Sequence, residues 1–81
     1  MNLYKISQDV NNDYDTYDSA IVAAYSEEEA RMIAPSGDSE WDGTADEYSD
    51  WCAASDVSVK LIGLAAHGIE KGVVLASFNA G

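Results

Sequence analysis

The sequence predicts a small α+β domain in which a mostly antiparallel, four-stranded sheet carries one short helix on one face. Three observations support this fold class. Four short stretches have the patterns of strands, one stretch has the capping signals of a helix, and their order is strand, strand, helix, long acidic loop, strand, strand (ββαββ). The chain has 81 residues, and we expect residues 1–81 to form a single domain.

The first two strands are expected at Asn2–Gln8 and Asp18–Tyr25. In the first, Tyr4 and Ile6 share one face, while Leu3 is apolar on the opposite, solvent-facing side. The second has apolar residues on both faces, which favours a central strand covered on both sides or paired at a subunit contact. The Asn- and Asp-rich stretch between them predicts a loop, so we expect these strands to form a hairpin.

The helix is expected at Ser26–Ala34. Ser26 is a suitable N-cap, and Glu29 stands three residues later, where a capping box requires it. Pro35 disfavours helical geometry in the residue before it, which predicts a helix end at Ala34. One face of this helix is apolar and should pack on the sheet, namely Ala30, Ile33 and Ala34.

The segment Ser36–Asp56 contains seven acidic residues and no basic residue. It predicts loops with a short helical turn near Asp46–Trp51. The last two strands are expected at Val57–Ala66 and Val73–Phe78. The glycine-containing turn His67–Gly72 between them predicts a second hairpin.

The net charge of -11 limits the partners of the chain. Direct binding to nucleic acid or to an anionic membrane surface needs clustered Lys and Arg, so we expect neither. A basic protein surface would be attracted, although high charge also serves solubility alone. A single cysteine, Cys52, and an N-terminus without a long apolar run favour a cytoplasmic protein without a signal peptide.

Four residues at alternate positions resemble the first ligands of a calcium loop, namely Asp9, Asn11, Asp13 and Asp15. The motif then fails, because Tyr14 occupies the glycine position and Ala20 the position of the bidentate glutamate. A loop built on Asx turns explains the same residues, so we expect no metal site.

No catalytic constellation is evident. Cys52 and His67 could form a thiolate–imidazole pair, but nothing in the sequence places them together or supplies a third orienting group. Carboxylate pairs are expected by chance among 15 acids, and they occur as Asp13/Asp15, Asp38/Glu40 and Asp46/Glu47. No glycine motif for phosphate binding is present. We therefore expect neither an enzyme nor a cofactor.

Aromatic residues stand among the acids of the long loop, as they do in many protein interfaces. The candidate protein-binding residues are Trp41, Asp42, Asp46, Glu47, Tyr48, Asp50 and Trp51. The alternative is that Trp41 and Trp51 fold inward and complete the core, which a small domain needs.

The stretches YDTYDSAIVAAYSEEEARMIAP and GVVLASFNAG resemble small uncharacterised proteins of bacteriophage and prophage genomes. These share an aromatic, acidic loop before a strand, a Ser-Glu-Glu helix and an FNAG-like ending. The resemblance implies a phage-type gene product in a bacterial cytoplasm, and it transfers no catalytic or binding residue.

The sequence thus favours a non-enzymatic, phage-type protein whose acidic face binds a basic surface of a host protein. One version of this hypothesis is nucleic-acid mimicry, with carboxylates in place of phosphates. The alternative is a structural or self-associating accessory protein, a homo-oligomer included, whose acidity serves solubility only.

Overall fold

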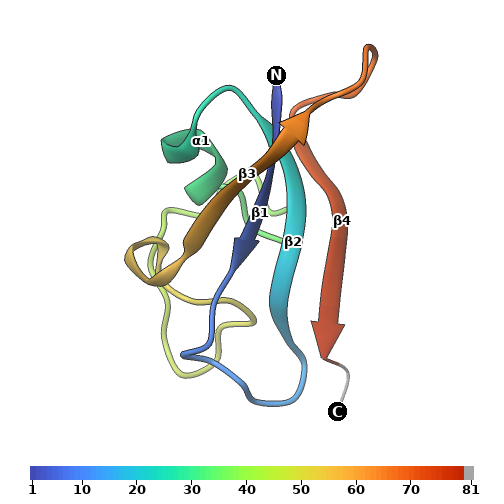
Figure 1. The fold of residues 1–81 in the computed structure, drawn as a ribbon. Coiled ribbons are helices and arrows are strands. Elements are labelled where there is room, and N and C mark those ends of the chain that lie inside the picture. Colours follow the sequence, from blue (N-terminus) through green and yellow to red (C-terminus); the bar gives the residue numbers. More distant parts are fainter. Residues whose placement is uncertain (80–81) are drawn as a thin grey trace.

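The computed structural model describes residues 1–79, so the last two residues of the FNAG ending lie outside the described part. Its elements follow the predicted ββαββ order, and the α+β fold class is confirmed. The strands and helices are β1 (Asn2–Ser7), β2 (Thr16–Ala24), α1 (Glu27–Arg31), a 3₁₀ helix (Ala54–Asp56), β3 (Ser58–Leu64) and β4 (Gly72–Asn79) (Figure 1).

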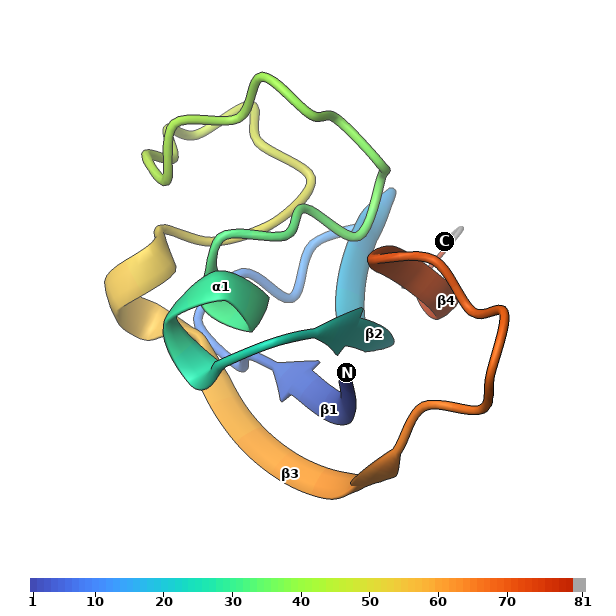
Figure 2. The same ribbon diagram turned by 90° about the horizontal axis from the view of Figure 1, so that it is seen from above.

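The four strands form one antiparallel sheet in the order β3-β1-β2-β4. The first predicted hairpin, β1 with β2, is confirmed. The second is wrong, because β3 pairs with β1 and β4 pairs with β2, at opposite edges of the sheet. Residues 65–71 connect these two edges around the side of the sheet that faces away from α1 (Figure 2). The stretch does contain the predicted turn, but a turn between two strands does not determine whether those strands pair with each other in the sheet.

The centre of the sheet holds the most deeply buried strand residues. Tyr4 and Ile6 of β1 and Val22 of β2 point to the face that carries α1, where Ile6 and Val22 are fully buried. Ala23 and Ala24 are also fully buried, so β2 is covered on both faces at its C-terminal end, whereas Ile21 on the face away from α1 is only half-buried.

Helix α1 begins as predicted and ends earlier. The Ser26 hydroxyl accepts a hydrogen bond from the Glu29 amide at 3.1 Å, which is the expected N-cap. The last helical residue is Arg31 rather than Ala34, because the amides of Met32 and Ile33 already make tighter, turn-like bonds. The unwound residues that follow lay Ile33 and Ala34 against the sheet.

A helix of five residues covers only part of the sheet, and the acidic segment 36–56 covers the rest of that face (Figure 2). Trp51 and Cys52 of this segment belong to the core. Arg31 links α1 to the C-terminal end of the acidic segment, because its guanidinium group donates hydrogen bonds to the carbonyls of Ala54 and Val57. The expected helical turn is a single hydrogen-bonded turn at Asp46–Ser49, and the 3₁₀ helix lies later in the segment.

Candidate functional site

The two acid-rich loops of the chain are held together. The Asn11 side-chain amide donates to the carbonyls of Ser49 and Trp51, both at 2.9 Å. The Tyr17 amide donates to the Asp50 carbonyl at 2.8 Å. These bonds join segments that are far apart in the sequence, so the acids of both loops present one surface with a defined shape.

The first of these loops, residues 9–15, is organised by a buried glutamine that the sequence analysis did not single out. The Gln8 side chain donates to the carbonyls of Asn11 and Tyr17 and accepts from the amides of Val10 and Asn11. The Asn11 side chain is committed to the acidic segment. Asp15 adopts a left-handed backbone conformation, with φ of 61°, which aspartate tolerates. Of the four calcium-like residues, Asn11 and Asp15 thus help to shape the loop, and no group of three His, Cys, Asp or Glu residues within 1–79 is arranged to hold a metal ion.

An open hollow of about 360 Å³ lies where the two loops meet. Among the described residues, four carboxylate residues and no basic residue line it, so we call it the acidic hollow. Asp46 and Glu47 belong to the predicted site, whereas Asp13 and Asp56 come from outside it. The complete lining is Val10, Asn11, Asp13, Ala45, Asp46, Glu47, Trp51, Cys52, Ala53 and Asp56.

Some acids of the segment have a structural role. Asp42 accepts from the amide and the hydroxyl of Thr44, and these bonds lower the pKa of its carboxyl group. Asp46 accepts from the Tyr48 amide, and Asp38 accepts from the Glu40 amide. These are Asx turns, which the residue type favours in loops. By contrast, the carboxylates of Glu47 and Asp50 make no hydrogen bond with the described residues, so the fold does not require their charge.

The aromatic residues of the segment separate into three environments. Tyr48 is 88% exposed and follows Glu47, a lining residue of the acidic hollow. Trp41 is half-buried, and its indole N–H donates to the Thr44 carbonyl at 2.8 Å. Trp51 is only 3% exposed and lies in the core, with an indole N–H that has no partner among residues 1–79. Of the seven candidate binding residues, Asp42, Asp46, Glu47, Tyr48 and Asp50 are exposed and Trp41 is partly exposed. Trp51 is buried in the core, so its side chain is not available to a partner.

Cys52 and His67 do not form a pair. Cys52 is buried beside the acidic hollow, whereas His67 is exposed in the connection beyond the far end of β3. Burial raises the pKa of the Cys52 thiol to about 11, and the nearby Asp56 charge acts in the same direction. A thiol of this kind is a poor nucleophile at neutral pH.

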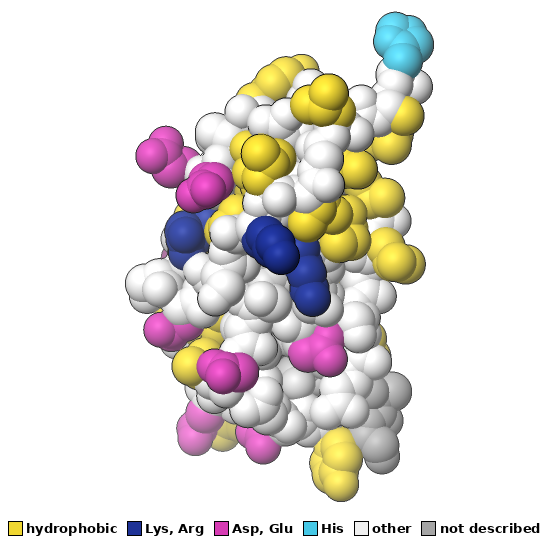
Figure 3. Space-filling model, in the orientation of Figure 1, with side chains coloured by type: hydrophobic (Ala, Val, Ile, Leu, Met, Phe, Trp, Pro, Cys, Tyr) yellow, Lys and Arg dark blue, Asp and Glu magenta, His cyan; other side chains and the backbone are white. Residues whose placement is uncertain are grey.

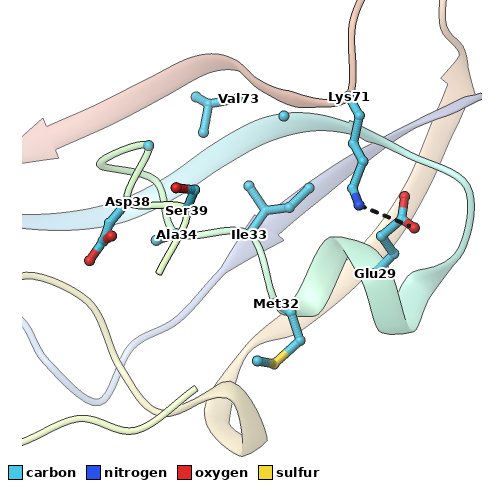
Figure 4. A pocket seen from close by; sticks show the side chains of 10 residues that line it. Glu29, Met32, Ile33, Ala34, Asp38, Ser39, Lys71 and Val73 are labelled. Atoms are coloured by element: carbon cyan, nitrogen blue, oxygen red, sulfur yellow. Dashed lines mark ion pairs between the residues drawn. The ribbon is translucent and has the colours of Figure 1, made fainter. Parts of the chain in front are cut away.

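A larger groove of about 530 Å³ lies between α1, the residues after it and the start of β4 (Figure 4). Its floor is apolar, and the ion pair between Lys71 and Glu29, 3.4 Å apart, closes one end. The Glu29 carboxylate also accepts from the Tyr25 amide, and this bond is the main cause of its lowered pKa. The polar groups at this end are thus paired with each other. The groove has room for a small apolar group, but the described residues that line it supply no convergent, unpaired polar groups that would select a ligand.

No protein-family model, curated protein or solved structure matches this chain. No helix within residues 1–79 has the length and apolar character needed to cross a membrane.

Proposed function

We propose that this chain is a non-enzymatic, phage-type binding protein that acts in the bacterial cytoplasm by engaging a basic surface of a host protein. One observation is the main support for this proposal. Four acidic residues from three separate parts of the chain, Asp13, Asp46, Glu47 and Asp56, line one hollow, and no Lys or Arg among the described residues lines it. Like charges repel, so folding alone gains nothing from gathering them.

The geometry suits a Lys or Arg side chain of a partner. Such a side chain entering the acidic hollow would form charge-assisted hydrogen bonds with the carboxylates. Tyr48, the exposed residue next to Glu47 in the sequence, offers an aromatic anchor of the kind that dominates many interfaces. The bonds from Asn11 hold the two loops in place before binding, which lowers the entropy lost on association.

In one form of the proposal the carboxylates stand in for the phosphates of a nucleic acid. The net charge of -11 supports this form, because it attracts the same basic surfaces that bind phosphate backbones. The alternative function is a structural or self-associating accessory protein. Exposed apolar residues on the edge strands favour that alternative, among them Leu64 of β3 and Leu75 of β4.

The test compares two variants of equal charge. Asp13→Asn/Glu47→Gln/Asp56→Asn neutralises hollow carboxylates that make no side-chain hydrogen bond with the described residues. Glu27→Gln/Glu28→Gln/Glu70→Gln neutralises three exposed acids elsewhere. Each chain is used to capture partners from bacterial lysate at low and high salt, and binding rates are measured with the partner that the original chain recovers.

We expect the control variant to recover the same partner as the original chain, and the hollow variant to lose it. The loss should come mainly from slower association with a flatter salt dependence. Equal binding by both variants would contradict the proposal. Recovery of nothing but further copies of the chain would favour the self-associating alternative.

A further inference from the structure

Two of the four basic residues lie directly opposite each other in the sheet. Lys5 of β1 pairs in register with Lys60 of β3. Their neighbours Tyr4, Ile6 and Val59 pack in the core under α1, so both lysines point to the opposite, open face. Figure 3 shows Lys and Arg side chains meeting near the middle of this side of the molecule, with apolar side chains gathered above and beside them.

Neither lysine forms an ion pair with any residue among 1–79. Like charges directly opposite on neighbouring strands destabilise a sheet. The one ion pair among residues 1–79 joins Lys71 to Glu29, and Arg31 is bound to backbone carbonyls. Within residues 1–79, Lys5 and Lys60 are therefore cations without an ion-pair partner, side by side in a chain whose net charge is -11.

The lysines continue into an apolar row. Lys5 pairs on its other side with Ile21 of β2, and Ile21 pairs with Leu75 of β4. One row across all four strands thus reads Lys60, Lys5, Ile21, Leu75, and Leu75 is 67% exposed. We call it the lysine–leucine row. Because adjacent strands lie about 4.8 Å apart, it presents two positive charges next to an apolar strip of similar width.

The acidic segment offers the complementary pattern. Glu47 and Asp50 precede and follow the exposed Tyr48 in the sequence, and their carboxylates make no hydrogen bond or ion pair with residues 1–79. The segment lies on the α1 side of the sheet, while the row lies on the other side, so the two cannot meet within one chain. They can meet between two chains.

We propose that the lysine–leucine row binds the acidic segment of a second copy of this chain, with Glu47 and Asp50 on the lysines and Tyr48 on Ile21 and Leu75. The contact joins two different surfaces, so it is heterologous and adds copies head to tail. A face-to-face dimer through the row would instead bring two lysine pairs together. At physiological ionic strength the Debye length is about 8 Å, whereas the molecule is 37 Å long. Only the charges near the contact therefore decide whether the electrostatic interaction between the two copies is attractive or repulsive.

The self-association does not depend on the proposed host partner. It is measured with the purified chain alone, by sedimentation velocity across protein concentrations in about 0.15 M salt. We expect species larger than the monomer that grow with concentration and diminish at high salt. A chain that remains monomeric at every concentration would overturn the proposal.

Two variants isolate the two halves of the contact. Lys5→Gln/Lys60→Gln removes the positive half, and Glu47→Gln/Asp50→Asn removes the negative half. Each alone should associate at least roughly tenfold more weakly than the original chain, as expected for lost charge pairs. Lys71→Gln, which removes a lysine outside the row, is the matched control and should associate normally.

Mixing the two variants gives the sharpest result. Each supplies the half that the other lacks, so the mixture should form a complex of one copy of each that does not grow further. A symmetric dimer that survives in either variant alone, or a mixture that stays monomeric, would overturn the proposal. The lysine variant should still capture the host partner, because its acidic hollow is unchanged. A failure of the proposed self-association can therefore be distinguished from a failure of the proposed host binding.

Discussion

The side-chain amide of Gln8 donates to the Tyr17 carbonyl at 2.9 Å and thereby closes the loop between β1 and β2. The same buried side chain makes three further bonds with the backbone of residues 10 and 11. One residue thus satisfies four backbone groups on which the position of Asn11, and with it the acidic hollow, depends.

This arrangement predicts that Gln8→Glu destabilises the fold, because a carboxylate cannot donate to the two carbonyls. We expect a loss of about 1–3 kcal/mol in the free energy of unfolding, the usual cost of leaving buried polar groups without partners. Urea denaturation measures the loss. Hydrogen exchange should become faster at the amides of Val10 and Asn11, while the amides of β4 serve as the internal control. Unchanged exchange would show that Gln8 does not hold the loop.

The N-cap of α1 makes a second prediction. Ser26→Ala removes the hydroxyl that accepts from the Glu29 amide, and should lower the stability by about 1 kcal/mol. Ser26→Asp retains an acceptor and is the matched control. If thermal melting of the alanine variant is the same as that of the original chain, Ser26 does not cap the helix in solution.

The decrease in the free energy of unfolding at acidic pH should depend in part on Glu29. Its pKa is lowered in the folded state, first by the Tyr25 amide and also by Lys71. The stabilisation is therefore fully present above the ordinary value of 4.5 and is lost as the pH falls through the lower, folded value. Glu29→Gln should show a flatter decline in this range, measured by urea denaturation between pH 5 and about 2. A parallel decline in both proteins would rule out this role.

Cys52 should contribute to the decrease in the free energy of unfolding at alkaline pH. Its pKa is raised from 9.0 to about 11, so the folded chain keeps a proton that the unfolded chain loses between these values. Stability should therefore fall as the pH rises through this window, and Cys52→Ala should lack this contribution. Alkylation at pH 8 should be roughly 100-fold slower than for an unperturbed thiol, since the thiolate fraction falls tenfold per pKa unit. Rapid labelling of the folded chain would show that the thiol is not buried.

The two tryptophans should respond differently to truncation. Trp51→Ala should cost about 3–5 kcal/mol, as for other large buried side chains, and Trp41→Ala clearly less. Trp51→Phe should be well tolerated, because the indole N–H that it removes has no partner among the described residues. Denaturation of the three variants tests this order. Equal losses for Trp41→Ala and Trp51→Ala would contradict the burial seen here.

The local patterns of the sequence determined the elements and their faces. Alternation in β1 decided that Tyr4 and Ile6 share the buried face, and the Ser26–Glu29 pattern decided where α1 begins. Asparagine and aspartate determined the loop between β1 and β2. These features depend on residues close together in the chain, where backbone geometry and short-range hydrogen bonds act.

Only the tertiary structure decided how these elements meet. The turn between β3 and β4 could not show that these strands take opposite edges, since strand pairing depends on which edges are free and which apolar faces remain to be covered. The short α1 left part of the core face open, so the acidic segment had to cover it, and Trp51 entered the core while Trp41 stayed near the surface. The acidic hollow and the lysine–leucine row followed from that packing, because each gathers charges that only long-range contacts bring together.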